Sequence, residues 1–364
     1  MYLTSSNLVY YLTGRATITR ASVVDGDFQV FELDGRNRCF KVLRRNQPSL
    51  FVKQIKVIDS RNVQCLEREA ACYRLVQSDP RYAALARLIP RFMDYDATRL
   101  TVIVEVLPGS EDLRECHRRL GSFPAEIGRA LGRGLGTLHS AIGREVVASA
   151  DVAAFPRETP WIISVHRSTD RESGTDGALT RIVRQDADWQ QSLDTIRQSW
   201  QCETLIHGDL KWDNAIVFPS ATAYPEIRLI DWEMADFGDS AWDVGGVFQA
   251  YWSIAILSAL RNSQTIPVQL SECIESGIEP MRPALREFWQ SYFAAREWRA
   301  DSEPEFLDRC MRCGAARMMQ TTFEYAAAIG QVNDRASAMF QLCRDALRDS
   351  RHAASWLLGL AERT

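Results

Sequence analysis

The sequence lacks any hydrophobic run long enough to cross a membrane as a helix. Its most apolar stretch, Val247–Leu260, has 14 residues, whereas a spanning helix needs about 20, so we predict a buried core helix there. The N-terminus lacks the basic start and cleavage site of a signal peptide, so we expect a cytoplasmic protein. An excess of one charge is missing too: 43 Lys and Arg oppose 47 Asp and Glu, which argues against broad binding to nucleic acid.

Cysteine spacing gives little support for a metal centre. The chain has nine cysteines, an odd number, and they are scattered through the sequence. Cys310 and Cys313 form a lone CxxC pair, and two thiolates do not complete the tetrahedral shell of a structural zinc site. We therefore predict that this pair lies on a helix as reduced, structural thiols.

Turn residues and apolar alternation divide the first part of the chain into strands, with one helix among them. From about residue 110 the apolar residues follow the helical period, apart from one short strand pair. The polar stretch His166–Gly177 is expected to be a mobile loop, and a substrate lid is the alternative. The fold class is therefore α+β, with a small β-rich lobe at residues 1–108, a large mainly helical lobe at residues 109–364, and a cleft between them. The expected strands are Ala16–Val24, Phe28–Leu33, Arg38–Leu43, Leu50–Val57, Leu100–Leu107, Ala215–Phe218 and Glu226–Ile230.

The strongest pattern is LIHGDLKWDN, Leu205–Asn214, followed by IRLIDWE, Ile227–Glu233. Asp209 and Asn214 lie in a loop that enters a short strand, and Asp231 ends the returning strand. Because a hairpin brings its two ends together, we expect three oxygen-bearing side chains at the same place. Phosphoryl transfer needs such groups, since a carboxylate orients the attacking hydroxyl and oxygen ligands hold Mg²⁺ against the nucleotide phosphates.

This pattern resembles the catalytic loop and metal aspartate of the aminoglycoside phosphotransferase and choline kinase superfamily, which has a bilobal, protein-kinase-like fold. The resemblance implies an ATP- and Mg²⁺-dependent phosphotransferase with Asp209 as catalytic base. It also implies that Asn214 and Asp231 bind the metal and that His207 supports the loop. Residues 1–108 would then form the nucleotide-binding lobe, and residues 109–364 the catalytic and substrate-binding lobe. The family's HGDxxxxN and DxE-like motifs are matched at His207, Gly208, Asp209, Asn214, Asp231 and Glu233.

Two neighbouring features resemble protein kinases. Lys211, two residues after Asp209, either offsets charge on the transferring phosphoryl group or is a solvated loop residue. Asp236–Gly238 spells the DFG motif, but it does not directly follow a strand and lies 22 residues after Asn214. Asp231 follows a strand and lies 17 residues after Asn214, so we assign the metal to Asp231 and regard the DFG as coincidence.

The segment Gly238–Phe248, GDSAWDVGGVF, resembles the family's G-D-P-A-x-D segment, with Ser240 in place of the usual Pro. The resemblance implies that Asp243 braces the catalytic loop through hydrogen bonds to its backbone. A buried carboxylate requires such partners.

A lysine and an acid that hold the nucleotide phosphates are expected in the first lobe. Lys53 lies on an apolar strand, and the helix that follows it begins near Asp59 and Ser60. At 100° per residue Glu69 falls inside the apolar stripe of this helix and Glu67 at its edge, so Glu69 is favoured as the partner of Lys53. Lys41 is the rival lysine, one strand too early. The stripe consists of Val63, Leu66, Ala70, Tyr73 and Val76.

Two further assignments complete the expected nucleotide site. The turn Asp25–Phe28, with Gly26, lies where the phosphate-covering loop should be; it lacks a GxGxxG pattern, and a plain hairpin turn fits it equally well. The segment LTVIVEVLPG resembles the inter-lobe hinge, in which Glu105 to Leu107 would offer backbone groups to adenine. A core strand fits the same segment.

The acceptor is expected to be a small molecule of the antibiotic, sugar or amino-alcohol type. Few residues separate Asp231 from Asp243, and the long activation segment and APE motif of protein kinases are missing. A peptide acceptor, with Lys211 as its support, and a non-catalytic nucleotide-binding protein are the alternatives. ATP or GTP as donor and the oligomeric state stay open. Several acidic residues are either a solvated face or receptors for a cationic substrate: Glu275, Glu279, Glu303 and Glu305.

Overall fold

The computed structural model describes residues 2–106, 109–147, 154–168, 174–218, 225–261 and 270–359. The chain forms two compact units, each built from separate segments of the sequence. The first, here called the sheet unit, comprises Met1–Cys116, Asp151–Phe155 and Asp213–Ala235. The second, here called the helical unit, comprises His117–Ala150, Pro156–Trp212 and Asp236–Thr364. The chain thus passes from one unit to the other inside the motif Leu205–Asn214.

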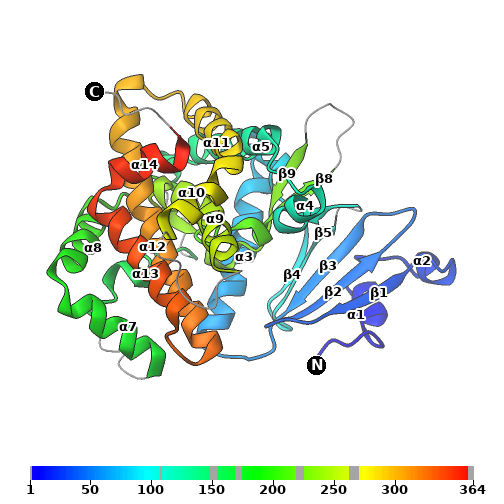
Figure 1. The fold of residues 1–364 in the computed structure, drawn as a ribbon. Coiled ribbons are helices and arrows are strands. Elements are labelled where there is room, and N and C mark those ends of the chain that lie inside the picture. Colours follow the sequence, from blue (N-terminus) through cyan, green and yellow to red (C-terminus); the bar gives the residue numbers. More distant parts are fainter. Residues whose placement is uncertain are drawn as a thin grey trace. The chain divides into compact units, whose positions relative to one another are not determined.

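The sheet unit contains a five-stranded antiparallel sheet with the strand order β1-β2-β3-β5-β4 (Figure 1). Four of its strands match the predicted ones, and β4 was not predicted. Lys53 lies on the central strand β3, where it pairs with Cys39 on one side and Val102 on the other. Because β3 has a neighbouring strand on each side, the backbone around Lys53 is held in place. The strands are β1 Gln29–Leu33, β2 Arg38–Leu43, β3 Ser49–Gln54, β4 Phe92–Asp96 and β5 Thr101–Val106.

The predicted strand Ala16–Val24 is wrong, because residues 16–19 form a turn and residues 20–24 are helical. Two short helices, α1 Leu8–Gly14 and α2 Arg20–Val24, precede the sheet. The side chain of Thr19 accepts a hydrogen bond from the Ser22 backbone N–H and caps α2, and this local bond outweighs the β-branched composition. Gly26, with φ of +67°, therefore follows a helix and not a strand, and its place in the phosphate-covering loop stays a prediction.

The helix α3, Ser60–Ser78, and a hairpin complete the parts of the sheet unit that position the site. The Asp59 side chain caps α3 as predicted, accepting the Asn62 N–H at 2.8 Å. The predicted strand pair is confirmed as β8 Ala215–Phe218 and β9 Glu226–Leu229, with β6 Glu111–Asp112 beside β8. The linking turn PSATAYP lies largely outside the described residues. Short 3₁₀ turns flank these elements at Pro80–Tyr82, Leu85–Arg87, Trp212–Asn214 and Trp232–Met234.

The helical unit consists mainly of packed helices, coloured from teal to red in Figure 1. A two-stranded sheet of β7 and β10 accompanies them. Residues 174–177 belong to α7, so that part of the predicted loop His166–Gly177 is wrong. The helix α4, Leu113–Leu120, crosses from the sheet unit into this one. The bounds are α5 Ala125–Ala141, α6 Arg144–Val147, β7 Thr204–Ile206, β10 Asp236–Gly238, α7 Gly174–Gln185, α8 Ala187–Ser199, α9 Ser240–Arg261, α10 Leu270–Ile278, α11 Arg282–Ala295, α12 Glu303–Ile329, α13 Asp334–Arg348 and α14 Ser350–Leu358, with 3₁₀ turns at Trp161–Ser164, Glu279–Met281 and Ala300–Ser302.

The two long helices α9 and α12 approach each other closely through glycines. A Cβ added to Gly245 would lie 2.5 Å from the Gly314 nitrogen and 2.7 Å from the Cys310 carbonyl oxygen, so no larger residue fits. This close contact brings the side chains of α12 near the start of α9. The apolar stretch Val247–Leu260 lies within α9, as predicted. Among the described residues, none of the helices combines the length and the hydropathy that a membrane crossing requires.

Cys310 and Cys313 are buried on α12 as free thiols, as predicted. Burial raises the pKa of both thiols well above the ordinary range, so they stay protonated and unreactive.

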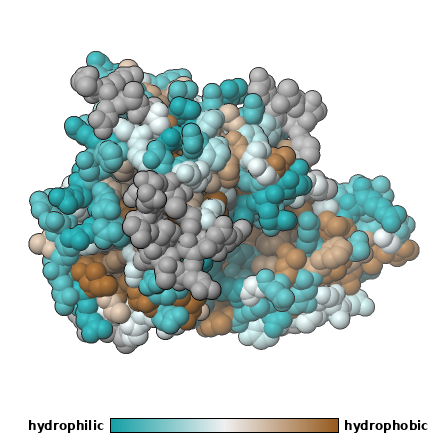
Figure 2. Space-filling view, in the orientation of Figure 1, coloured by the Kyte–Doolittle hydropathy of each residue, from teal (hydrophilic) through white to brown (hydrophobic). Residues whose placement is uncertain are grey.

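The surface of the sheet unit carries exposed hydrophobic side chains. Figure 2 shows hydrophobic surface over the part of the molecule formed by the strands. Phe31 and Leu33 on the edge strand β1 are 41% and 40% exposed. The polar and charged groups described below instead lie largely inside the two units.

Candidate functional site

Lys53 lies at the centre of three carboxylates in the sheet unit. Its ammonium nitrogen is 2.8 Å from Glu69 Oε2, 2.5 Å from Asp231 Oδ1 and 3.0 Å from Glu233 Oε2. Glu69 is buried on α3, whereas Glu67 is exposed. The predicted pair of Lys53 with Glu69 is therefore confirmed.

The three carboxylates keep Lys53 charged although it is 6% exposed. Burial lowers the pKa of this ammonium, but Glu69 and Asp231 together raise it above the ordinary value. An ammonium has three N–H donors, and all three have a carboxylate within 3.0 Å. Lys53 is thus a rigidly held positive charge.

Two of the carboxylates are held by further partners in the sheet unit. The Tyr73 hydroxyl donates to Glu69 Oε1 at 3.3 Å, and Arg36 of the β1–β2 turn forms an ion pair with Glu233. The Asp231 side chain is 35% exposed, compared with 5% for Glu69 and 10% for Glu233. Asp231 is therefore the carboxylate that a bound group reaches most easily.

The donor set of this cluster suits a hard cation. Glu69, Asp231 and Glu233 each present an oxygen, and these oxygens lie within 4.8 Å of one another. Mg²⁺ prefers carboxylate oxygens and the oxygens of substrate phosphates, so the residues present fit a magnesium–nucleotide site. Asp231 has a left-handed backbone, with φ of +64°. Asp tolerates this region better than most residues, and such backbones often occur at functional sites.

The hairpin brings Asn214 and Asp231 to the same end, as predicted. Ala215 pairs with Leu229 across the strands, and the Ile230 N–H donates to the Asn214 carbonyl oxygen at 2.9 Å. Asp231 follows directly, and Asn214 is buried. Both residues belong to the sheet unit, whereas Asp209 belongs to the helical unit, so the predicted convergence of all three side chains stays a prediction.

Asp209 lies between two cations of the helical unit. Its Oδ1 is 2.8 Å from Arg317 Nη2, and its Oδ2 is 2.7 Å from Lys211 Nζ. Burial would raise the pKa of Asp209, but Arg317 and Lys211 outweigh it and hold the pKa well below the ordinary range. Asp209 is thus ionised at neutral pH. The Lys211 side chain is 41% exposed and the Arg317 side chain is 5% exposed.

The backbone of the loop that carries Asp209 is held by hydrogen bonds to a buried carboxylate. Asp243, on the first turn of α9, accepts the backbone N–H groups of His207 at 2.6 Å and Gly208 at 3.0 Å. The imidazole of His139 lies 3.3 Å from the same carboxylate. The predicted bracing role of Asp243 is confirmed. His207 is completely buried and accepts the Asp209 N–H through Nδ1 at 3.3 Å, which agrees with a supporting role.

The literal DFG motif uses its aspartate differently. Asp236 lies on β10 of the helical unit, and its carboxylate accepts the backbone N–H groups of Arg157 at 2.8 Å and Glu158 at 3.2 Å. The Phe237 N–H also donates to it, at 2.8 Å. A carboxylate that accepts three backbone N–H groups has a structural use, which favours Asp231 for the metal.

Sequence reasoning did not identify three of these contacts. Arg317 contacts Asp209 across 108 positions of the chain, Arg36 contacts Glu233, and Glu233 contacts Lys53 directly. The sequence did contain one signal for Arg317, since this charged residue lies in the apolar run Ala315–Met319 of a predicted helical region. A charge at such a place requires a partner.

The expected hinge is described only in part. The Glu105 N–H donates to the Arg91 carbonyl oxygen at 2.8 Å, and Glu105 pairs with Leu50 within the sheet. Leu107 lies outside the described residues. The binding of adenine by this segment stays a prediction.

Comparisons with solved structures place this fold among kinases. Plasmodium vivax ethanolamine kinase has 14% identity and a TM-score of 0.59 over 96% of this chain and 90% of that one. The GDP and kanamycin complex of APH(2")-IIia has 16% identity and a TM-score of 0.53 over 93% and 99%. A glucosamine kinase in complex with glucosamine, ADP and inorganic phosphate has 17% identity and a TM-score of 0.51 over 91% and 85%. At these identities the likeness shows the fold, which is protein-kinase-like.

Sequence comparison identifies the family. No curated protein matches the chain significantly. The model of the phosphotransferase enzyme family matches residues 27–266, which include Lys53, Glu69, the loop of Asp209 and the hairpin that ends at Asp231. Because the match covers more than half of the sequence, the chain belongs to the phosphotransferase enzyme family and is a phosphotransferase.

Proposed function

We propose that this enzyme transfers the γ-phosphate of ATP, with Mg²⁺, to a hydroxyl group of a small molecule in the cytoplasm. The observation that carries the proposal is the buried ammonium of Lys53 among Glu69, Asp231 and Glu233, of which Asp231 is the most exposed. A fixed cation beside an accessible carboxylate suits the phosphates and the metal of a nucleotide. The free thiols of the described cysteines agree with a reducing compartment.

In the sheet unit, Lys53 would bind the α- and β-phosphates while Glu69 keeps its ammonium in place. Asp231 and Asn214 would hold Mg²⁺, which when bound supplies positive charge that neutralises the nucleotide phosphates. Residues 1–108 form the proposed nucleotide-binding lobe, and Asp213–Ala235 belongs to the same compact unit. The hinge segment at Glu105 would contact adenine.

In the helical unit, Asp209 would accept a hydrogen bond from the acceptor hydroxyl and orient its oxygen for in-line attack on the γ-phosphorus. Because Asp209 is a weakly basic carboxylate, it would receive the proton late, after the bond to phosphorus has begun to form. Lys211 would offset negative charge on the transferring group. Residues 109–364 form the proposed catalytic and substrate-binding lobe.

A small acceptor is favoured over a protein. Ser240 begins α9 nine positions after Asp231, and the described residues between them form a 3₁₀ turn and the strand β10. A long activation segment that would bind a peptide has no room there. The comparison proteins are named for ethanolamine and glucosamine, and one holds kanamycin; all three are small hydroxyl-bearing molecules.

The test is a screen of small alcohols, amino alcohols and aminoglycosides that measures nucleotide consumption with ATP or GTP, in the presence of Mg²⁺ or EDTA. We expect acceptor-dependent turnover that EDTA abolishes and that Asp209→Ala reduces to background while nucleotide binding persists. Asp301→Ala, which removes an exposed carboxylate paired with Arg299, is the control and should retain full activity. Full activity in Asp209→Ala, or phosphate incorporation into protein alone, would refute the proposal.

A further inference from the structure

Lys41 lies on the same face of the sheet as Lys53. Lys41 on β2 pairs with Phe51 on β3, and Phe51 is two positions before Lys53. Paired residues, and residues two positions apart on one strand, point to the same face, so the two lysines occupy diagonal positions about 7–8 Å apart. The opposite face of these strands is packed in the hydrophobic core, where Phe40 and Val52 are completely buried.

The ammonium of Lys41 has no ion pair or hydrogen bond among the described residues. Lys41 is partly buried, and its cross-strand neighbours are Phe31 of β1 and Phe51 of β3. The positions that the described strands β1, β2, β3 and β5 contribute to this face carry no acidic residue. Burial of a charge among apolar neighbours is costly unless the charge is paired. An anionic ligand would therefore supply the missing counter-ion.

The cluster around Lys53 has no excess of positive charge for the phosphates of a nucleotide. The ammonium nitrogen of Lys53 lies within 3.0 Å of three carboxylates, which outnumber Lys53 and its neighbour Arg36. Carboxylates repel phosphates, and a phosphate oxygen reaches Lys53 only where it replaces one of these groups. A second cation on the same face would offset this repulsion.

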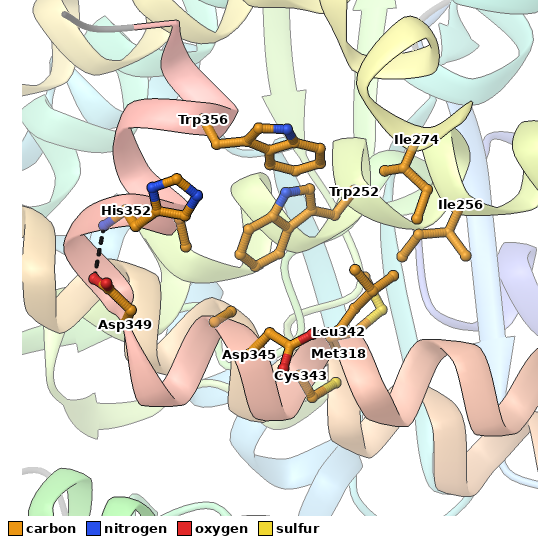
Figure 3. A pocket seen from close by; sticks show the side chains of 12 residues that line it. Trp252, Ile256, Ile274, Met318, Leu342, Cys343, Asp345, Asp349, His352 and Trp356 are labelled. Carbon is orange, nitrogen blue, oxygen red and sulfur yellow. Dashed lines mark hydrogen bonds between the residues drawn. The ribbon is translucent and has the colours of Figure 1, made fainter. Parts of the chain in front are cut away.

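A cavity of the helical unit offers the phosphates no comparable cation. It has a volume of about 220 Å³, and Figure 3 shows Trp252 and Trp356 extending toward one another across it. The ionisable residues in its lining are Asp345, Asp349 and His352, and no lysine or arginine is among the described lining residues. Because carboxylates repel an anion, this cavity is unsuited to the charged part of a nucleotide.

The strand register indicates which phosphate lies nearest Lys41. Glu105 of the expected hinge pairs with Leu50, which is on the side of Phe51 that faces away from Lys53 along β3. Lys41 is level with Phe51, so it lies between Lys53 and the hinge end of the sheet. With the base at the hinge and the β-phosphate at Lys53, the α-phosphate is the group nearest to Lys41.

We propose that Lys41 binds the α-phosphate of the nucleotide donor, as a second cation beside Lys53. Its ammonium donates hydrogen bonds to the non-bridging oxygens of this phosphate, and no covalent bond changes there. Because the α-phosphate is not transferred, Lys41 contributes to nucleotide affinity and not to the chemical step. The inference rests on the proposed function for the identity of the nucleotide, but its test needs neither an acceptor nor Mg²⁺.

The test is a titration of the full chain with adenosine, AMP and ADP in EDTA, followed in ¹⁵N–¹H spectra. We expect Lys41→Met to weaken the binding of AMP and of ADP by the same factor, roughly tenfold, because both ligands carry an α-phosphate. The binding of adenosine, which has no phosphate, should stay unchanged. Lys41→Arg keeps a cation at this position and should recover most of the affinity.

The matched control is Arg20→Met, which removes an exposed cation of the same unit from the first position of α2. It should change the affinity for none of the three ligands. Because the Lys41 ammonium has no partner among the described residues, Lys41→Met should also keep the melting temperature of the wild type. Equal ADP affinity in Lys41→Met and the wild type, or an equal loss of adenosine affinity, would overturn the proposal.

The outcome is separable from that of the proposed function. A wild-type chain that binds neither ADP nor GDP would refute the proposed function and the Lys41 contact together. Binding of ADP that does not depend on Lys41 would overturn the contact alone and leave the proposed function in place. In the complete reaction, Lys41→Met should raise the KM for the nucleotide roughly tenfold and keep kcat.

Discussion

Arg317 and Asp209 form a nearly buried ion pair: Nη2 of the arginine lies 2.8 Å from Oδ1 of the aspartate. The guanidinium also lies over the Trp242 ring, 5.4 Å from its centroid, and its Nη1 donates to Gln320 at 3.3 Å. Arg317 thus fixes one carboxylate oxygen of Asp209 and helps to keep the group ionised. Such an aspartate orients a hydroxyl well but is a weak base, which suits a loose phosphoryl-transfer transition state.

Removal of Arg317 should lower activity and change its pH dependence. Arg317→Met removes the buried cation that contacts Oδ1 of Asp209 and frees this oxygen to move, so we expect kcat to fall on the order of 10- to 100-fold. Because Arg317 lowers the pKa of Asp209, its loss should move the acid limb of the kcat/KM profile to higher pH. Arg317→Lys should restore part of both effects.

The matched control for this variant is Arg309→Met. Arg309 also projects from α12 and binds an aspartate, Asp239, at 2.5 Å, but this pair does not touch Asp209. Arg309→Met should reduce stability and leave the acid limb unchanged. For Arg317→Met, the loss of stability should be complete above about pH 4 and shrink below it. The lowered pKa of Asp209 stabilises the fold fully above the unfolded value of about 3.9, and this contribution declines as the pH falls toward the folded pKa. A pH profile equal to that of the wild type would contradict the assignment.

The two candidate metal aspartates are distinguishable by a magnesium titration. Asp231→Asn should abolish the Mg²⁺-dependent part of ATP affinity, since its carboxylate is the most exposed of the cluster around Lys53. Asp236→Asn should lower the melting temperature, because three backbone N–H groups lose a charged acceptor, and retain the magnesium dependence. Retained magnesium dependence in Asp231→Asn would transfer the metal to another residue.

Local sequence patterns predicted the parts of the site that depend on short chain distances. The spacing from Asp209 to Asn214 and the hairpin that ends at Asp231 are encoded within 23 consecutive residues. Helical periodicity was enough to choose Glu69 over Glu67, because one face of α3 is buried. Patterns of this kind need no knowledge of distant segments.

Patterns failed where distant residues or competing local bonds decide the structure. Arg317 contacts Asp209 because α9 and α12 approach through Gly245 and Gly314. The apolar run around Arg317 indicated that this charge needs a partner, but nothing local identified Asp209 as that partner. The β-branched residues before the first strand predict β structure, yet the cap at Thr19 stabilises the helix α2. The strand β4 was missed because its sequence, FMDYD, contains two aspartates, which are depleted in strands.

The hydrogen bonds between Asp243 and the backbone of the catalytic loop should be essential for both stability and turnover. Asp243→Ala leaves the buried N–H groups of His207 and Gly208 without their acceptor, at a cost of roughly 3 kcal/mol or more in the free energy of unfolding. We expect kcat to fall on the order of 100-fold as the loop moves. Asp243→Asn keeps one oxygen acceptor and should recover part of the stability. Unfolding in urea and steady-state kinetics measure the two effects; a fully active Asp243→Ala enzyme would contradict the brace.

Removal of Lys53 should destabilise the sheet unit in a pH-dependent way. Lys53→Met leaves Glu69, Asp231 and Glu233 within 4.8 Å of one another without the ammonium that they share. Uncompensated buried charge costs about 3–5 kcal/mol. The repulsion raises the pKa values of the carboxylates, so the destabilisation should be largest at neutral pH and should shrink toward pH 5 as they protonate. Lys53→Met/Glu69→Gln removes one of the three charges and should recover part of the stability at pH 7, although ATP affinity stays low in both variants. Urea denaturation at pH 5 and pH 7 decides the matter, because a loss of stability that is equal at both pH values would mean that Lys53 contributes packing and not charge.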